Sequence, residues 1–237
     1  MIRIQVFSKF LHHFRAKIEW CNCVKSLKRK NMVKCDTEEK LSAQAQAYCS
    51  HLLQHKLPPG LFYHNILHTQ AVAEAAVAIG LGCGLPPQSL QVLQMAAWFH
   101  DTGYAYKYKG HEQESCALAK EFLREQNADD LLLGQVIACI AATKQPQAPK
   151  SLLEKILCDA DMCHLGQTSY AGSSDLLRKE IEVFTGEEFS DAAWHRQNVQ
   201  FLSEHSYFTA FARKTFDAQK KLNLEHEIKL LQHSNKT

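Results

Sequence analysis

The sequence lacks long apolar runs, linker-like stretches and low-complexity tracts. No apolar run approaches the roughly 18 residues that a membrane span requires, and the N-terminus lacks the pattern of a cleaved secretory signal, so we expect neither feature. Glycine and proline number only 10 and 6 among 237 residues, and they separate segments instead of filling one. Because 46% of the residues are hydrophobic, we expect one domain with a sizeable core.

Strand patterns are also missing, since no pair of segments alternates apolar and polar residues convincingly. Apolar residues instead recur at helical spacing, in segments that end at breaks such as 56–60 and 82–88. Asp36-Thr-Glu-Glu39 and Ser151-Leu-Leu-Glu154 resemble capping boxes, which satisfy free N–H groups where a helix begins. We therefore predict an all-α fold with a compact domain over 36–237. A first helix follows the Asp36 cap and ends at the break over 56–60, and further helices are expected over 61–80, 89–101, 112–126, 129–144, 151–166, 173–184 and 190–232.

The nine cysteines are an odd number, and the chain is too long to need disulfide bonds for its stability. Several of them lie within helical apolar patterns, as Cys139 does. We therefore expect reduced, mostly buried thiols in a cytoplasmic protein. Cys21 and Cys23 carry groups that bind metals, but their spacing is poor for zinc and no second pair lies nearby.

An excess of positive charge is found only at the N-terminus. Residues 1–35 hold nine Lys or Arg against one acidic residue, Glu19, which leaves 18 basic and 24 acidic residues in the rest of the chain. This balance argues against a uniformly basic surface, and we expect no stable nucleic-acid complex. Apolar residues at helical spacing predict that 1–35 form a basic amphipathic extension. Such a helix could contact a membrane surface or a partner, direct the protein to an organelle, or pack on the core.

Five ionisable side chains fall on helix faces that are otherwise apolar. His64 and His68 are one helical turn apart on the apolar face of the second predicted helix. His100 continues an apolar row of the next helix, and Asp101 lies directly beside it. Asp161 continues an apolar row of the helix that begins near residue 151. The pattern predicts that these side chains, which come from three helices, converge in the core.

Each of these residues alone has an ordinary explanation, because a buried histidine is commonly hydrogen-bonded and an aspartate near a helix end is often a cap. Two carboxylates and two imidazoles that converge in an apolar bundle instead indicate a bound cation. The set suits a divalent ion such as Mn²⁺, Fe²⁺, Zn²⁺, Mg²⁺ or Ni²⁺, and four ligands leave positions open for water and substrate. Asp159, by contrast, continues the row of Lys155 and is expected to face outward.

The ordered motifs Tyr63-His64-Asn65-x-x-His68, Phe99-His100-Asp101 and Ala160-Asp161 resemble the H…HD…D pattern of the HD superfamily of metal-dependent phosphohydrolases. The Tyr-His-Asn turn is similar to a helix of cyclic-nucleotide phosphodiesterases. The stretches FHDTGY, HEQES and DADMCHLG look more like small uncharacterised HD-domain hydrolases. The resemblance covers about residues 37–170 and does not include 1–35. It implies an HD-domain helical bundle, here with additional C-terminal helices.

Carried onto this sequence, the resemblance implies that His68, His100, Asp101 and Asp161 are the metal ligands. It also implies that His64 matches a phosphodiesterase histidine that protonates the leaving oxygen. A bound ion would activate a water, which Asp101 or Asp161 could orient. For His64 the alternative is a partner that only orients a ligand, or a hydrogen bond at a helix start.

Binuclear members of the superfamily carry further histidines between the HD pair and the last aspartate. His111 is one candidate for this role, but Thr143 and Lys144 stand where a second would be expected. This departure favours a single firmly held metal ion.

The loop that follows the HD pair is expected at the mouth of the site, because it continues directly from Asp101. Lys107 and Lys109 could attract phosphate there, and the tyrosines beside them could stack on a base. His111 and Glu112 begin the next helix and are also assigned to substrate binding, as is Lys144 at the end of a later helix. The alternative is an ordinary solvated loop, with a carboxylate and a cation that stabilise helix ends.

The sequence therefore predicts a metal-dependent phosphohydrolase whose substrate is a nucleotide or a similar small phosphoester. One alternative is a cyclic-nucleotide or alarmone phosphodiesterase. The other, from a different class, is a metal-stabilised binding or regulatory module without catalytic turnover.

Overall fold

The part of the chain described by the computed structural model is residues 32–235, with side chains from Lys40 onward. This part contains helices, turns and loops and no strand, which confirms the predicted all-α class. The basic amphipathic helix that we predicted lies outside the described residues, as do Cys21 and Cys23. The six cysteines whose side chains are described are all free, and four of them are buried, as expected for reduced thiols.

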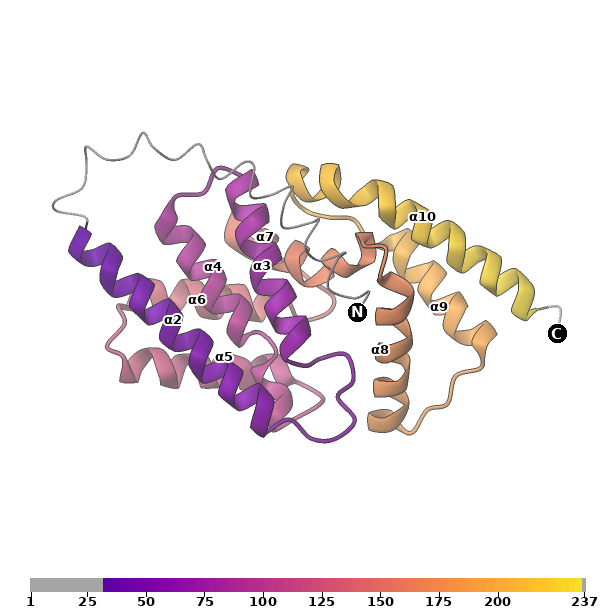
Figure 1. Ribbon diagram of the computed structural model, residues 1–237, viewed down its shortest axis with the longest axis horizontal. Helices are drawn as coiled ribbons and strands as arrows, with labels where there is room; N and C mark the ends of the chain where they lie inside the picture. Colours follow the sequence, from indigo (N-terminus) through magenta and orange to yellow (C-terminus); the bar gives the residue numbers. More distant parts are fainter. Residues whose placement is uncertain (1–31, 236–237) are drawn as a thin grey trace, which may run out of the picture. The chain divides into compact units, whose positions relative to one another are not determined.

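The helices follow one another with short connections (Figure 1). Their bounds are α2 Met32–His55, α3 Ile66–Gly82, α4 Pro87–Phe99, η1 Thr102–Ala105, α5 His111–Glu125, α6 Asp130–Ala142, α7 Leu152–Asp161, η2 Met162–Gly166, α8 Tyr170–Thr185, α9 Asp191–Glu204 and α10 Ala210–Ser234.

Helix α4 is the central element of the core. It packs against α3, α5, α6 and α7, and its side chains from Val92 to Phe99 are almost all buried. Pro86 and Pro87 begin the helix, where a missing N–H costs nothing and the fixed φ angle suits the first turn. Because the last turn of α4 lies in the core, His100 and Asp101, which follow Phe99, are buried as well.

The two predicted capping boxes have different outcomes. Ser151 caps α7, since its Oγ accepts a hydrogen bond from the N–H of Glu154 while the Glu154 carboxylate accepts one from the N–H of Lys150. Asp36, in contrast, is not a helix start, because α2 already begins at Met32. The chain divides into a unit up to Lys40 and a compact unit from Leu41 onward.

The first turns of α10 are fixed to α7 by Asp159. Its carboxylate is 1% exposed and accepts hydrogen bonds from the N–H groups of Phe208 (2.7 Å) and Thr209 (2.8 Å). Thr209 in turn caps α10 through the N–H of Ala212. The prediction that Asp159 faces outward is therefore wrong. Helical periodicity within α7 cannot show that a segment 50 residues later covers this side of the helix.

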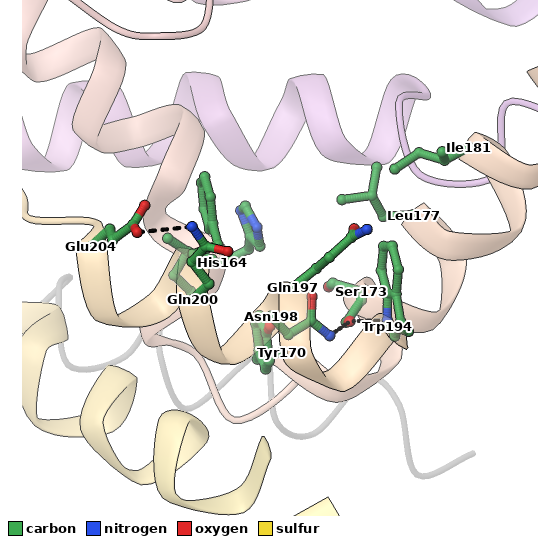
Figure 2. A pocket seen from close by; sticks show the side chains of 13 residues that line it. His164, Tyr170, Ser173, Leu177, Ile181, Trp194, Gln197, Asn198, Gln200 and Glu204 are labelled. Carbon is green, nitrogen blue, oxygen red and sulfur yellow. Dashed lines mark hydrogen bonds between the residues drawn. The ribbon is translucent and has the colours of Figure 1, made fainter. Parts of the chain in front are cut away.

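The predicted helical stretch 190–232 is two helices, α9 and α10, which lie side by side (Figure 1). Helices α8 and α9 border a pocket of about 380 Å³, whose wall also includes His164 of η2 (Figure 2). Among residues 32–235, no helix has the length and apolar character needed to cross a membrane.

We expect Asp159→Ala to lower the free energy of unfolding by about 2–4 kcal/mol, because two buried N–H groups lose a charged acceptor. Asp159→Asn keeps one acceptor oxygen and should cost less. Urea unfolding measures both values. Asp175→Ala, at an exposed position of α8, is the matched control. Equal stability of Asp159→Ala and the control would contradict the anchoring role.

Candidate active site

His68 is placed by the cap of α3. The Asn65 side chain accepts a hydrogen bond from the N–H of Leu67 and donates one to the carbonyl of Phe62, so the helix begins at Ile66. His68 is therefore in the first turn and its side chain faces the core. His64 precedes the cap, so our prediction that it belongs to the same helix is wrong. The two rings are nevertheless close, with centroids 5.5 Å apart.

His100 and Asp101 follow the last turn of α4, where the chain leaves the helix. His100 Nδ1 donates a hydrogen bond to the carbonyl of Ala97 at 2.7 Å, which fixes the tautomer and leaves the lone pair on Nε2. Both side chains are almost fully buried, and η1 begins directly after them. The end of α4 thus places an imidazole nitrogen and a carboxylate in the core.

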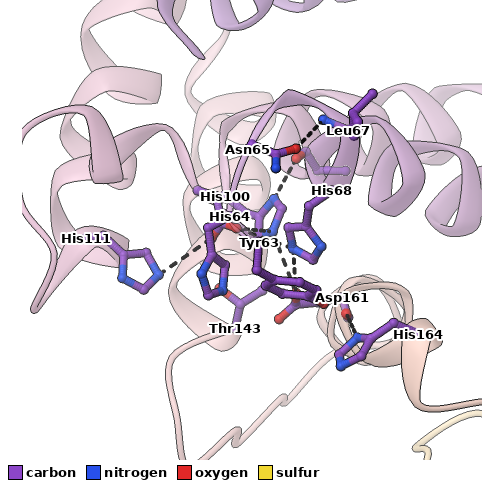
Figure 3. A network of polar contacts seen from close by, with 12 residues as sticks. Tyr63, His64, Asn65, Leu67, His68, His100, His111, Thr143, Asp161 and His164 are labelled. Carbon is purple, nitrogen blue, oxygen red and sulfur yellow. Dashed lines mark hydrogen bonds and ion pairs between the residues drawn. The ribbon is translucent and has the colours of Figure 1, made fainter. Parts of the chain in front are cut away.

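Asp161 reaches the same point from the end of α7, as Figure 3 shows. Its Oδ1 lies 3.4 Å from His68 Nε2 and 3.7 Å from His100 Nε2. Asp101 Oδ2 lies 3.3 Å from His68 Nε2 and 3.1 Å from His100 Nε2. The predicted convergence of these four side chains from α3, α4 and α7 is therefore observed.

The donor atoms of this cluster fit a metal ion. His68 Nε2, His100 Nε2 and Asp101 Oδ2 are buried, and none has a hydrogen-bond partner among the described residues, although the two nitrogens lie only 3.3 and 3.1 Å from Asp101 Oδ2. These three residues form a group of potential ligand atoms within 4.8 Å of one another. Metal–ligand bonds of about 2.0–2.2 Å place neighbouring ligand atoms about 3.0–3.5 Å apart. The atoms are thus spaced and oriented to share one cation.

The charges in the cluster support the same conclusion. Burial alone would raise the pKa of Asp101, but the neighbouring His100 holds it well below its usual range. Burial alone would lower the pKa of His100, but Asp101 and Asp161 raise it well above its usual range. The carboxylates are therefore ionised, and they stabilise the protonated, positively charged form of the two imidazoles. A divalent cation supplies that charge directly, in competition with protons.

His111 is brought to the other side of Asp101 by a close approach of η1 to α5. A Cβ on Gly103 would lie 2.0 Å from the His111 carbonyl oxygen, so only glycine fits there. The Gly103 N–H donates to Ser115 Oγ, which holds the two segments together. His111 Nε2 then lies 3.5 Å from Asp101 Oδ1 and 3.9 Å from Glu112 Oε1.

Tyr104 separates His64 from His111. Its ring stacks on His111 at a centroid distance of 3.7 Å and on His64 at 4.6 Å, and the side chain is buried. Tyr104 is one of three loop tyrosines, with Tyr106 and Tyr108, that the sequence suggested for base stacking, and its ring is already stacked on two histidines. It fixes the positions of both imidazoles beside the cluster.

Glu180 of α8 is the residue that sequence reasoning missed. Its carboxylate is fully buried, accepts the backbone N–H groups of Tyr63 (2.8 Å) and His64 (3.0 Å), and forms a close contact with His64 Nδ1. This pairing directs the Nδ1 proton of His64 to the carboxylate and leaves Nε2 for proton transfer. Glu180 lies more than 100 residues after His64 in an amphipathic helix, so no local pattern marks it.

His164 of η2 is a second residue that the sequence analysis did not select. Its Nδ1 donates to the carbonyl of Asp161 at 3.2 Å, and its ring lies 5.4 Å from that of Tyr63. Burial and the nearby charge of His68 lower the pKa of His164 to about 4, so the imidazole is neutral at pH 7. The sequence signal that could have identified His164 is its position in the stretch DADMCHLG, which resembles small HD-domain hydrolases.

The three lysines assigned to substrate binding are not part of this cluster. Lys107 and Lys109 are exposed in the turn between η1 and α5, and Lys144 is exposed just beyond α6. Their role in phosphate binding stays a prediction, as do those of His111 and Glu112.

Comparison with known families identifies the framework of this site. Residues 65–166 match the sequence model of the HD domain, and this segment contains His68, His100, Asp101 and Asp161. Residues 65–166 thus correspond to an HD domain. The α7–η2 segment closes this HD domain, and α8, α9 and α10 are the additional C-terminal helices. HD domains bind divalent metal ions, which agrees with the ligand atoms of the cluster.

Solved structures with the same fold extend over most of the chain. YpgQ of Bacillus subtilis, in complex with ADP, is 19% identical and superposes with a TM-score of 0.61, covering 83% of this chain and 96% of that one. A predicted HD superfamily hydrolase from an uncultured Thermotogales bacterium is 20% identical, with a TM-score of 0.53 and coverages of 81% and 91%. The Lin1889 protein of Listeria innocua is 16% identical, with a TM-score of 0.58 and coverages of 81% and 94%. No curated protein sequence gives a significant match.

We expect Mn²⁺ to stabilise the protein against unfolding by about 2.7 kcal/mol when its concentration is 100 times the dissociation constant. His68→Ala should remove this stabilisation, because one buried ligand atom is lost. Thermal unfolding with Mn²⁺ and with a chelator measures the effect. His55→Ala, at an exposed position of α2, is the control and should respond like the original protein. Undiminished stabilisation of His68→Ala would show that the ion binds elsewhere.

Proposed function

We propose that this protein is a metal-dependent phosphohydrolase that hydrolyses a nucleotide or a similar small phosphoester. The observation that carries the proposal is the convergence of His68, His100, Asp101 and Asp161. The facing atoms His68 Nε2, His100 Nε2 and Asp101 Oδ2 are buried without a hydrogen-bond partner among the described residues, and Asp161 Oδ1 lies 3.4 Å from His68 Nε2. Such a group is costly in an apolar core unless a cation completes it. The HD framework supports hydrolysis of phosphoesters as the reaction class.

The four residues would hold the ion, with Asp101 and Asp161 supplying the negative charge. When bound, a divalent ion polarises a phosphoryl oxygen and lowers the pKa of a coordinated water. Asp101 has a second oxygen, Oδ1, directed toward His111, and this oxygen can orient the attacking water.

His64 is the group that we assign to proton transfer. Its Nδ1 is paired with Glu180, so Nε2 is the atom that can give a proton to the leaving oxygen. The ring is held between Glu180 and Tyr104, and its side chain is 18% exposed. The imidazole is thus partly accessible and fixed in orientation, as a general acid requires.

A nucleotide is favoured as the substrate for two reasons. The structurally similar YpgQ has been solved as a complex with ADP. In addition, Lys107 and Lys109 are exposed in the loop that follows Asp101, where they can attract phosphate groups. We further propose a small-molecule partner and a cytoplasmic location, which the free thiols support. Contacts of residues 1–35 with a membrane or partner stay a prediction.

The purified, Mn²⁺-loaded protein should hydrolyse at least one member of a panel of nucleoside mono-, di- and triphosphates, cyclic nucleotides and ppGpp. Asp101→Ala should lower kcat/KM about a thousandfold or more, since the lost stabilisation amounts to several kcal/mol. Phosphate release measures both. Asp175→Ala is the control at an exposed aspartate.

The panel also separates the alternatives. Turnover restricted to cyclic nucleotides or ppGpp would assign the phosphodiesterase function. Mn²⁺ binding without any turnover would assign a regulatory or binding module, and activity retained by Asp101→Ala would exclude the proposed centre.

Glu180→Gln tests how His64 is positioned. We expect kcat to fall about 10–100-fold with little change in KM, because the amide cannot hold His64 as the carboxylate does. His64→Ala should lower kcat at least as much, and the double variant should resemble His64→Ala alone. Glu187→Gln, at an exposed site near the end of α8, is the control. Additive losses in the double variant would show that Glu180 acts independently of His64.

A further inference from the structure

We propose that the pocket between α8 and α9 binds the nucleobase of the substrate while its phosphates lie at the metal centre. This proposal rests on the proposed phosphohydrolase function and specifies the substrate class as nucleoside phosphates. Three features of the pocket support it: its size, the chemistry of its walls and its position next to the metal cluster.

The pocket is large enough for a small ligand. Its volume is about 380 Å³, within the range of about 300–1,000 Å³ that is usual for ligand sites. It lies between α8 and α9 and reaches η2 at one end (Figure 2). Both helices belong to the compact unit that begins at Leu41.

Apolar and aromatic side chains form much of the wall. Trp194 is buried at one end, where its Nε1 donates to Ser174 Oγ at 3.0 Å. Leu177 and Ile181 lie beside it on α8 (Figure 2). Phe201, which also lines the pocket, leaves 42% of its surface exposed. A flat aromatic ligand would cover these apolar surfaces, and a stacked ring adds a favourable contact.

The polar groups of the pocket match a neutral, hydrogen-bonding ring. Gln197 extends into the space between His164 and Trp194 (Figure 2), and its amide offers both a donor and an acceptor. Near Phe201, Gln200 donates to Glu204 Oε1 at 3.0 Å, so a carboxylate is available to accept an amino or imino hydrogen of a base. None of the described lining residues is lysine or arginine. The walls therefore suit a nucleobase and disfavour phosphate.

The pocket adjoins the metal cluster through two elements. His164 lines the pocket, and its Nδ1 is hydrogen-bonded to the backbone of the ligand residue Asp161. On α8, Ile181 lines the pocket, and the preceding residue, Glu180, contacts His64. Two lining residues, His164 and Ile181, are thus directly bonded or adjacent in sequence to residues that contact the cluster, and on this basis we assign the phosphate to the cluster and the base to the pocket. Binding energy from the base would then orient the reacting phosphate.

The test compares substrates with and without a base. Ser173 lines the pocket, so Ser173→Phe should fill it, whereas Ser203→Phe adds the same ring on an exposed part of α9 outside it. For the nucleotide that is hydrolysed best, we expect Ser173→Phe to raise KM at least tenfold. For ribose 5-phosphate or tripolyphosphate, kcat/KM should change less than twofold. Ser203→Phe should change neither, and circular dichroism checks that both variants fold.

Gln197→Ala provides a second variant at an exposed position. It should raise KM for the nucleotide several-fold and alter the preference among adenine, guanine, cytosine and uracil nucleotides. Equal changes for substrates with and without a base, or no change in nucleotide KM for either variant, would overturn the proposal.

A binding experiment remains informative if no substrate is hydrolysed. Adenosine and guanosine, which lack phosphate, are titrated while tryptophan fluorescence is recorded. Saturable quenching in the original protein that is lost in Ser173→Phe and kept in Ser203→Phe supports the pocket, even when the phosphohydrolase proposal fails. Absence of binding by either nucleoside, in a protein that does hydrolyse nucleotides, assigns the base to another place.

Discussion

The fold depends on how two buried carboxylates and two buried imidazoles are compensated. In an apolar core, each charged or polar atom without a partner costs free energy that the surrounding packing must offset. Here the side chains come from the ends of α4 and α7 and from the first turn of α3. Helix ends have free backbone groups and changes of chain direction, which allow Asp101 and Asp161 to meet within the core. The bundle around them is therefore arranged to hold a cation.

Three histidines around the cluster are oriented by the same kind of hydrogen bond to the backbone. His100, His111 and His164 each direct Nδ1 toward the carbonyl of the residue three positions earlier, at distances of 2.7, 3.2 and 3.2 Å. The backbone therefore fixes the tautomer and leaves Nε2 as the acceptor. His64 differs, because its Nδ1 is paired with the carboxylate of Glu180. The carboxylate stabilises the protonated form of His64, which suits the proton transfer that we assign to it.

Much of the fold and the cluster could be predicted from the sequence because the relevant signals are local. Helical spacing of apolar residues is sufficient to place His68, His100 and Asp161 on inward faces. Other features depend on segments distant in the sequence. Asp159 is buried only because α10 begins against it, and Glu180 acquires its role only because α8 packs beside residues 63 and 64. Periodicity within one helix contains no information about either contact.

Asp159 and Asp161 are two residues apart in the last turn of α7, and they serve different parts of the molecule. One fixes the start of α10, and the other completes the buried cluster. Because Asp159 holds the last turn of α7 to the start of α10, this turn cannot unfold without moving the Asp161 carboxylate away from the cluster. At the proposed metal site, retention of an ion and attachment of the C-terminal helices would be linked equilibria, each changing the other by the same factor. Slow amide exchange throughout α10 would then report on occupancy of a site whose side chains come from α3, α7 and the end of α4.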